Sequence, residues 1–414
     1  MNLIIKIINK MKKVWSNWSA LLLTLVVIAM VVYFLSGCTK MQPQAQASYA
    51  AQFEAPMEAD AYTKLNDNEY IDSCFRWLEK KTTGGSVKLQ AKEYILTKDV
   101  ILPQMIKNTV RKKFLIDMNG AKILNFGFVD TASTWTTIHN VNTFRSFTIR
   151  NGEFNGAKQT ALKIQGCQMN SFENLVFAGC KTGGYFGLCL QTQMNLIEEN
   201  QCRDTGLYIG LAQGKGCDAS NSQSNNVTLT TFRSFGAGNA MALIADQVSG
   251  CRFVNLTNEG AGSKYFLYVN GKNSNWMKSF IAQDLHIETE NRVACIYAYL
   301  DGYARFTFEN IWAQHGNILV DGYGTGTIYV NDIVYQPNIP SDKYPTLKCK
   351  NNGGESSPLW WQFTDCTRYG GKPFKDPFYW ILQTGTSIPK PFTDGQVSTN
   401  FGNNRLKEVI QIKE

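Results

Sequence analysis

The chain has 414 residues, of which 44% are hydrophobic and 18% are charged. This composition is typical of a folded protein with a sizeable core and excludes an intrinsically disordered chain. The formal net charge is +8, and it falls to about +4 without the first 37 residues, which hold four lysines and no acid. Such a mild excess does not indicate a nucleic-acid partner. The 11 cysteines lack Cys-x-x-Cys spacing, so we expect neither a metal site nor a cofactor.

Residues 1–37 have the organisation of an export signal. A basic stretch precedes an apolar run of 16 residues, Ala20 to Leu35, and Ser36-Gly37-Cys38 follows. Small residues that lead directly into a cysteine resemble the lipobox of bacterial lipoproteins. The resemblance implies cleavage before Cys38, lipidation of that residue, and an exported protein anchored to a membrane of the cell envelope or cell surface. The alternative is a plain transmembrane anchor, for which this apolar run is short.

Residues 38–65 are rich in Ala and Gln and are predicted to form a flexible tether. An amphipathic helix is expected next, from about Glu69 to Lys81, with Asp67 or Asn68 as its N-cap. Its apolar face consists of Ile71, Phe75 and Leu78.

Gly84-Gly85 ends this helix, and two short strands are expected between Ser86 and Leu96, before the run Val100–Pro103. A helix followed by Gly-Gly, Val-x-Leu, a short turn and Tyr-x-Leu resembles the start of the pectate-lyase superfamily of right-handed parallel β-helices. In that superfamily the helix caps the open end of the solenoid. Together with the repeats that follow, the resemblance covers about residues 66–336. It implies the fold more specifically than an activity.

From Thr148 to Gln336 one pattern keeps returning, an Asn, Asp or Thr followed by a large apolar residue. It occurs at Asn174-Leu175, Thr231-Phe232, Asn255-Leu256, Asp284-Leu285, Asn310-Ile311 and Asp332-Ile333. The first interval is 57 residues, about two turns, and the others are 24, 29, 26 and 22. Short β-branched and aromatic runs at such a period are typical of a solenoid whose rungs pair in parallel. The sequence therefore predicts an all-β fold, a right-handed parallel β-helix with an N-terminal capping helix.

The pattern breaks after Gln336. Residues 337–414 hold most of the prolines and several aromatic clusters, and we expect them to form an irregular C-terminal cap over the last rung. The predicted organisation is thus a signal at 1–37, a tether at 38–65, a capped β-helix at 66–336 and a cap at 337–414. One further local repeat, Cys180 and Cys202, predicts two cysteines at equivalent positions one rung apart, either stacked or bridged.

Strand alternation assigns two outward columns to this repeat. The second residue after each Asn, Asp or Thr gives Val176, Arg233, Thr257, His286, Trp312 and Val334. The fourth gives Ala178, Phe235, Glu259, Glu288, Gln314 and Gln336. One outer face is therefore expected to carry acids, an imidazole, a guanidinium and an indole from successive rungs.

Adjacent rungs lie about 4.8 Å apart, so Glu259 and Glu288 are expected to be stacked neighbours. Carboxyl groups about 5–5.5 Å apart are typical of retaining glycosidases. We therefore take Glu259, Glu288 and His286 as candidate catalytic residues. The candidate substrate-binding residues are Trp312, Arg233 and Asp284. The alternative interpretation of this face is an ordinary solvated polar surface.

Several motifs of β-helix enzymes are missing from the sequence. There is no Asn-Thr-Asp or Gly-His-Gly of polygalacturonases, and no Arg-x-Pro-x-x-Arg of pectate lyases. Two functions therefore stay open. The first is a cell-envelope hydrolase or lyase acting on polysaccharide, because the long side of a solenoid suits an extended glycan. The second is a non-catalytic glycan-binding or tailspike-like adhesin module.

Overall fold

The computed structural model describes residues 65–104, 111–142 and 145–335, with interior gaps at 219, 237–240, 261, 272–278, 290, 301–303, 314–317 and 325, and six strands between 346 and 412. The chain divides into two compact units, Met1–Glu54 and Ala55–Glu414, and all described residues belong to the second. The predicted signal, Cys38 and nearly all of the tether therefore lie outside the described residues. Within the described part of the chain, no helix is long and apolar enough to cross a membrane.

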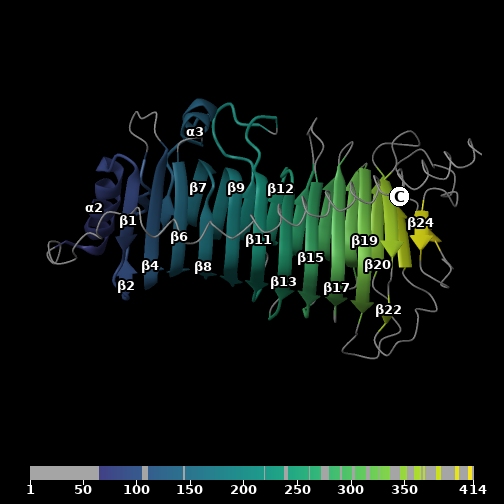
Figure 1. Ribbon diagram of the computed structural model, residues 1–414. Helices are drawn as coiled ribbons and strands as arrows, with labels where there is room; N and C mark the ends of the chain where they lie inside the picture. The colour runs from purple at the N-terminus through teal and green to yellow at the C-terminus, as the bar shows by residue number, and fades with distance from the viewer. Residues whose placement is uncertain are drawn as a thin grey trace, which may run out of the picture. The chain divides into compact units, whose positions relative to one another are not determined.

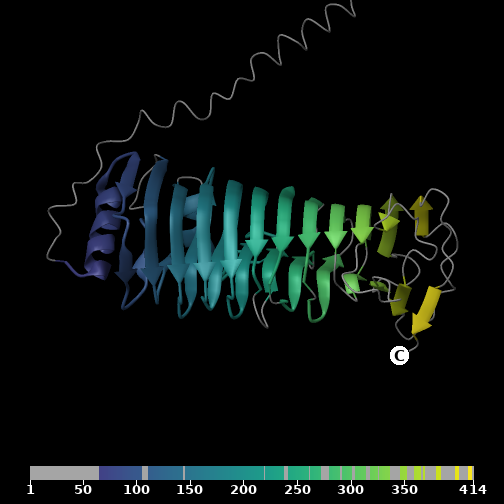
Figure 2. The same cartoon turned by 90° about the horizontal axis from the view of Figure 1, so that it is seen from below.

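The first described element of the second unit is the predicted amphipathic helix, α2 (Asp67–Lys80). Ile71, Phe75 and Leu78 are completely buried. Figure 2 shows α2 at one end of the strand stack, beside β1 (Gly84–Lys88). The expected capping helix is confirmed, since its apolar face packs against the first rung of the solenoid.

The helix N-cap differs from the expected Asp67 or Asn68. Asn66 is the N-cap, and its side chain and that of Glu69 form a reciprocal capping box. The Asp67 carboxylate instead accepts the backbone N–H of Ile95 at 2.7 Å. Both candidates are thus drawn into contacts with the first turn of the solenoid, since Asn68 donates to a carbonyl there as well.

The described strands form one sheet in which the pairings are parallel, wound as the predicted right-handed β-helix (Figure 1). Two ladders make up its walls. The first contains β1, β2 (Glu93–Ile95), β4 (Lys112–Leu124), β6 (Arg145–Asn155), β8 (Ser171–Ala178), the second half of β9 (Thr182–Asn200), β11 (Asn225–Ser234), β13 (Cys251–Asn258), β15 (Ser279–Ile287), β17 (Arg305–Ala313) and β19 (Gly326–Tyr335).

The second ladder contains β3 (Val100–Ile101), β5 (Phe128–Val129), β7 (Thr160–Gln168), the first half of β9, β10 (Thr205–Gly210), β12 (Met241–Asp246), β14 (Tyr265–Asn270), β16 (Ala294–Leu300) and β18 (Ile318–Gly324). Inward side chains of both ladders fill one continuous core rich in Phe, Leu and Ile. Phe253 and Phe280, for example, pack edge to face at 5.0 Å from adjacent rungs.

Seven consecutive strands of the first ladder, from β6 to β17, share one register position with a left-handed backbone. The residues at this position are Asn151, Asn174, Leu196, Thr231, Asn255, Asp284 and Asn310, with φ between 51° and 65°. Asn and Asp tolerate this conformation better than other L-residues, which explains the repeated pattern in the sequence. The side chains also bond along the axis, as where Asn174 Nδ2 donates to Asn151 Oδ1 at 3.2 Å.

A short helix that the sequence pattern does not predict, α3 (Trp135–Asn142), interrupts the chain between β5 and β6. It lies outside the stack of strands, above β7 and β9 in Figure 1. Its buried Ile138 packs with Leu188 and Ala212 in a second, small core. Helix α3 and the segment after β10 therefore form an insertion on the side of the solenoid.

Most of the expected C-terminal cap, residues 337–414, lies outside the described residues. Its six described strands pair in parallel with the preceding rungs and with one another. They are β20 (Thr346–Asn351), β21 (Leu359–Thr364), β22 (Thr367–Arg368), β23 (Tyr379–Gln383), β24 (Val397–Asn400) and β25 (Val409–Ile412).

Four of the buried cysteines form two pairs on adjacent rungs. Cys180 and Cys202 are free, fully buried and in hydrogen-bond contact, so the stacked alternative applies rather than the bridged one. Cys167 and Cys189 form a second stacked pair with the two Sγ atoms 3.4 Å apart.

Candidate functional site

The predicted outer column exists as a row along the first ladder. Strand register aligns, in order, Lys122, Glu153, Val176, Glu198, Arg233, Thr257, His286, Trp312 and Val334. We call these nine positions the outer row. Successive members lie one rung apart because parallel pairing keeps the register fixed between the turns.

Arg233 of the outer row forms an ion pair with Glu259. Its Nη2 atom lies 3.5 Å from Glu259 Oε2, and the two side chains are 46% and 31% exposed. Arg233 also lies over the Phe235 ring, with its guanidinium carbon 5.0 Å from the ring centre. Half-exposed pairs of this kind contribute little to stability. The Arg233 side chain is accessible to a ligand because nearly half of its surface is exposed.

His286 and Glu288 form the second polar pair. The His286 Nε2 atom lies 2.7 Å from Glu288 Oε1, and both side chains are 43% exposed. Trp312, the next member of the outer row, packs against His286 with ring centres 4.2 Å apart and planes inclined at 52°. An indole, an imidazole and a carboxylate are thereby held together at the surface.

The two candidate acids are neighbours along the backbone. Glu288 N–H donates to the carbonyl of Asn258, which places Glu288 beside Glu259 on the next rung. Their carboxylates, however, contact different side chains, since Glu259 contacts the Arg233 guanidinium and Glu288 contacts the His286 imidazole. The arrangement is two polar pairs side by side, and the catalytic role remains a prediction.

Asp284 has a structural role in addition to its predicted one. It occupies the left-handed bend of β15 with φ 57°, and its Oδ1 accepts a hydrogen bond from Asn310 Nδ2 at 2.5 Å. The other oxygen atom and the exposed position leave it able to contact a ligand, so substrate binding by Asp284 stays a prediction.

Glu198 belongs to the outer row but escapes the sequence pattern. It pairs in register with Arg233 and with Val176. Its strand has Leu196 where other rungs have Asn, Asp or Thr. The repeated pattern therefore does not mark this rung, which lies within the 57-residue interval between Asn174 and Thr231. The length of that interval, about twice the other intervals, is the signal of a further rung, although Leu196 divides it unevenly into 22 and 35 residues.

The sequence pattern also does not reveal a set of stacked tyrosines on the second ladder. Tyr185 stacks on Tyr208 with ring centres 4.5 Å apart and planes at 3°, and Tyr268 stacks on Tyr297 at 4.9 Å and 6°. Because the rings cover one another's faces, they offer edges rather than flat faces to a sugar. Tyr208 donates to Asp246 Oδ2 at 2.7 Å, and burial together with that carboxylate raises its pKa. We therefore interpret this column as structural.

The described residues contain no group of three or more His, Cys, Asp or Glu side chains placed to hold a metal ion.

No protein-family model matches this chain, and neither does any curated protein. Among solved structures it is similar to PfbA, a surface adhesin of Streptococcus pneumoniae, with 8% identity, a TM-score of 0.43, and coverage of 82% of this chain and 90% of that chain. A second structure of PfbA gives 10% identity and a TM-score of 0.35, covering 87% and 100%. Endopolygalacturonase I from Stereum purpureum, complexed with galacturonate, gives 9% identity and a TM-score of 0.29, covering 80% and 94%. None of these likenesses assigns an activity to this chain.

Proposed function

We propose that this protein is a polysaccharide-binding β-helix, displayed on the cell envelope through a lipid on Cys38, that holds an extended glycan along the outer row. The observation that supports binding best is the cluster of Trp312, His286 and Glu288 next to the pair of Arg233 and Glu259. It combines an aromatic ring with charged hydrogen-bonding groups on consecutive rungs. Those are the groups that recognise the apolar and hydroxyl faces of sugars.

Binding is favoured over hydrolysis because each carboxylate already contacts a different polar side chain. A retaining glycosidase needs two carboxyl groups that face one glycosidic bond. Here Glu259 and Glu288 contact Arg233 and His286 instead. A hydrolase or lyase is the second candidate, favoured by the 2.7 Å contact of an imidazole with a carboxylate beside an indole.

The test is binding of the purified full-length protein to a panel of acidic and neutral polysaccharides. We expect Trp312→Ala to weaken binding roughly tenfold or more, the loss typical of a truncated aromatic anchor. Arg233→Ala should weaken it less. Arg252→Ala is the matched control, because Arg252 is an exposed arginine on the same ladder whose guanidinium contacts Gln283.

A reducing-end assay and an assay for unsaturated products run beside the binding measurement decide between the two candidates. The binding function predicts no product from any glycan. Products that disappear in Glu288→Gln would instead establish an enzyme that uses this carboxylate. If no glycan binds to the wild-type protein, the proposed function is wrong.

A further inference from the structure

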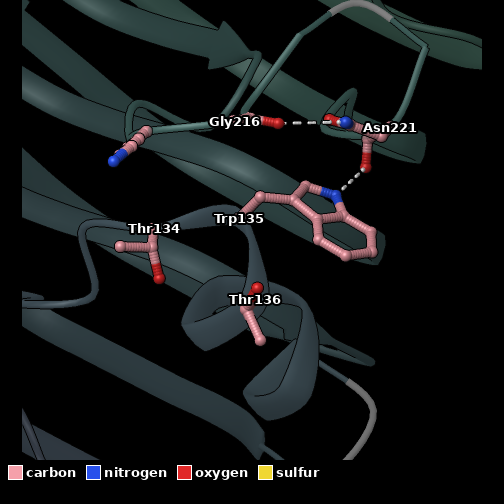
Figure 3. Close-up of a pocket in the computed structure, with 6 residues that line it drawn as sticks. Thr134, Trp135, Thr136, Gly216 and Asn221 are labelled. Atoms are coloured by element: carbon pink, nitrogen blue, oxygen red, sulfur yellow. Dashed lines mark hydrogen bonds between the residues drawn. The ribbon is translucent and has the colours of Figure 1, made fainter.

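A pocket lies on the insertion, between the start of α3 and the segment that follows β10 (Figure 3). Its volume is about 470 Å³, within the usual range for small-molecule sites of about 300–1,000 Å³. It is lined by Thr134, Trp135, Thr136, Lys215, Gly216 and Asn221. None of these residues belongs to the outer row, so the pocket is a second site.

Hydrogen bonds join the two walls of this pocket. The backbone N–H of Trp135 donates to the carbonyl of Lys215, and the backbone N–H of Lys215 donates to the carbonyl of Ser133, both at 2.9 Å. The indole N–H of Trp135 donates to the Asn221 carbonyl at 3.3 Å, and Asn221 Nδ2 donates to Gly216 O at 3.0 Å, as Figure 3 shows. The indole is therefore fixed by its edge next to the loop that carries Lys215.

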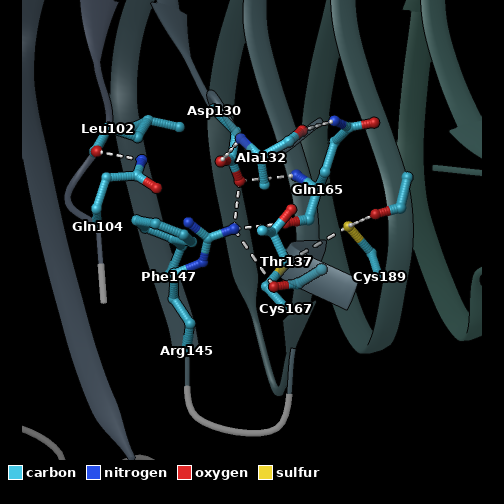
Figure 4. Close-up of polar contacts among 12 residues, drawn as sticks. Leu102, Gln104, Asp130, Ala132, Thr137, Arg145, Phe147, Gln165, Cys167 and Cys189 are labelled. Atoms are coloured by element: carbon cyan, nitrogen blue, oxygen red, sulfur yellow. Dashed lines mark hydrogen bonds and ion pairs between the residues drawn. The ribbon is translucent and has the colours of Figure 1, made fainter. Parts of the chain in front are cut away.

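A buried polar network anchors both walls to the solenoid (Figure 4). Gln165 Nε2 donates to the Ala132 carbonyl at 2.9 Å, and its Oε1 accepts the backbone N–H of Gln213 at 2.6 Å. One side chain thus holds the segment before α3 and the loop after β10. Beneath it, the completely buried Arg145 donates to Asp130 and to the Gln165 carbonyl. A site built on fixed walls loses little entropy on binding.

The lining has a distinctive chemistry. It offers one indole, the hydroxyl group of Thr136, one ammonium group from Lys215, and no acid, while the Thr134 hydroxyl is bonded to Thr137 Oγ1 at 2.9 Å. The flat indole suits the apolar face of a pyranose ring, and the Thr136 hydroxyl suits one of its hydroxyl groups. An ammonium group with no carboxylate in the lining favours an anionic group on that ring.

We infer that this pocket binds one uronic acid residue of a polysaccharide, with Trp135 against the sugar ring and Lys215 paired with its carboxylate. The inference rests on the proposed function and specifies its ligand as an acidic glycan. The pocket is a separate contact, so a chain that occupies both it and the outer row gains affinity from both.

The test is calorimetric titration of the full-length protein with a uronate oligosaccharide, and with the same oligosaccharide after reduction of its carboxyl groups to alcohols. The wild-type protein should prefer the acidic form. Lys215→Met should weaken binding of the acidic form about tenfold and abolish the preference, while Trp135→Ala should weaken both forms. Lys181→Met is the matched control, because Lys181 is an exposed lysine on the solenoid.

The outcomes separate the two proposals. If Lys215→Met retains the wild-type affinity and preference while Trp312→Ala loses binding, the pocket assignment is overturned and the proposed function stands. If Lys215→Met binds the reduced form as weakly as the acidic one and melts at the wild-type temperature, the assignment holds. A wild-type protein that binds neither oligosaccharide overturns both. Because Lys215 is exposed, its substitution is not expected to impair folding.

Discussion

Leu196 occupies a backbone position that suits it poorly. Its φ is 53° and its side chain is 52% exposed, so it is both in the left-handed region and apolar in water. The neighbouring rungs have Asn174 and Thr231 at the same position. The left-handed conformation costs an ordinary L-residue about 1–2 kcal/mol, and Asn less.

We therefore expect Leu196→Asn to increase the free energy of unfolding by about 1 kcal/mol, mainly by relieving backbone strain. Chemical denaturation of both proteins checks this. Leu196→Ala is the control, since it removes the exposed apolar group but keeps the unfavourable φ. A gain from alanine equal to that from asparagine would show that exposure, and not the backbone, was the cause.

Glu199 is an acid buried at the end of β9. Burial raises its pKa, although the Ser234 hydroxyl at 2.6 Å and the Cys202 N–H at 2.8 Å partly offset this by hydrogen bonds to the carboxylate. The pKa of Glu199 in the folded protein lies above its pKa in the unfolded chain, which is about 4.3. The protonated Glu199 side chain therefore contributes its full stabilisation below about pH 4.3. This stabilisation is lost as the pH rises through the folded-state pKa.

Glu199→Gln should therefore flatten the fall in stability between pH 4 and pH 7, so that the variant gains most over the wild type at neutral pH. Unfolding free energies measured across that range test the prediction. Glu198→Gln removes the same charge from the half-buried neighbour and should keep most of the pH dependence. Wild-type and Glu199→Gln curves that run parallel would contradict the assignment.

At the scale of the elements, hydrophobic periodicity predicts the helix and strands that pack against the core. It does not predict an element that is stabilised mainly by tertiary contacts. The capping helix has its apolar stripe at Ile71, Phe75 and Leu78, so the sequence predicts it. Helix α3 has the sequence Trp-Thr-Thr-Ile-His-Asn-Val-Asn, which is poor in strong helix formers. It is held by burial of Ile138 and by the anchored segment before it, and neither contact is visible in the local sequence.

The candidate site divides in the same way. The outer row follows from strand alternation, so Arg233, His286 and Trp312 could be predicted as members of one row. The partners of Glu259 and Glu288 could not be predicted, because each carboxylate meets its partner through its side-chain rotamer rather than through strand register. The pocket on the insertion combines Trp135 with Lys215, which are 80 residues apart, and no periodic pattern links them.

At the scale of the whole molecule, a solenoid is a stack in which each rung contacts mainly its neighbours. Its end is therefore the weak point. The first-rung strand β1 pairs with β4, and helix α2 packs against it. Phe75 of α2 reaches the core edge to face with Phe128 at 5.1 Å. The helix thus covers an edge that would otherwise be available to a strand of another molecule.

Substitution of two phenylalanines distinguishes the capping role of α2 from ordinary core packing. Phe75 in the cap and Phe253 in the middle of the solenoid are both completely buried, and each packs edge to face against one Phe, at 5.1 and 5.0 Å. Truncation to Ala should cost each about 3–5 kcal/mol. We expect only Phe75→Ala to self-associate with rising concentration, as measured by light scattering, because loosening α2 uncovers β1. Equal association of the two variants would mean that self-association results from general destabilisation and not from exposure of the β1 edge.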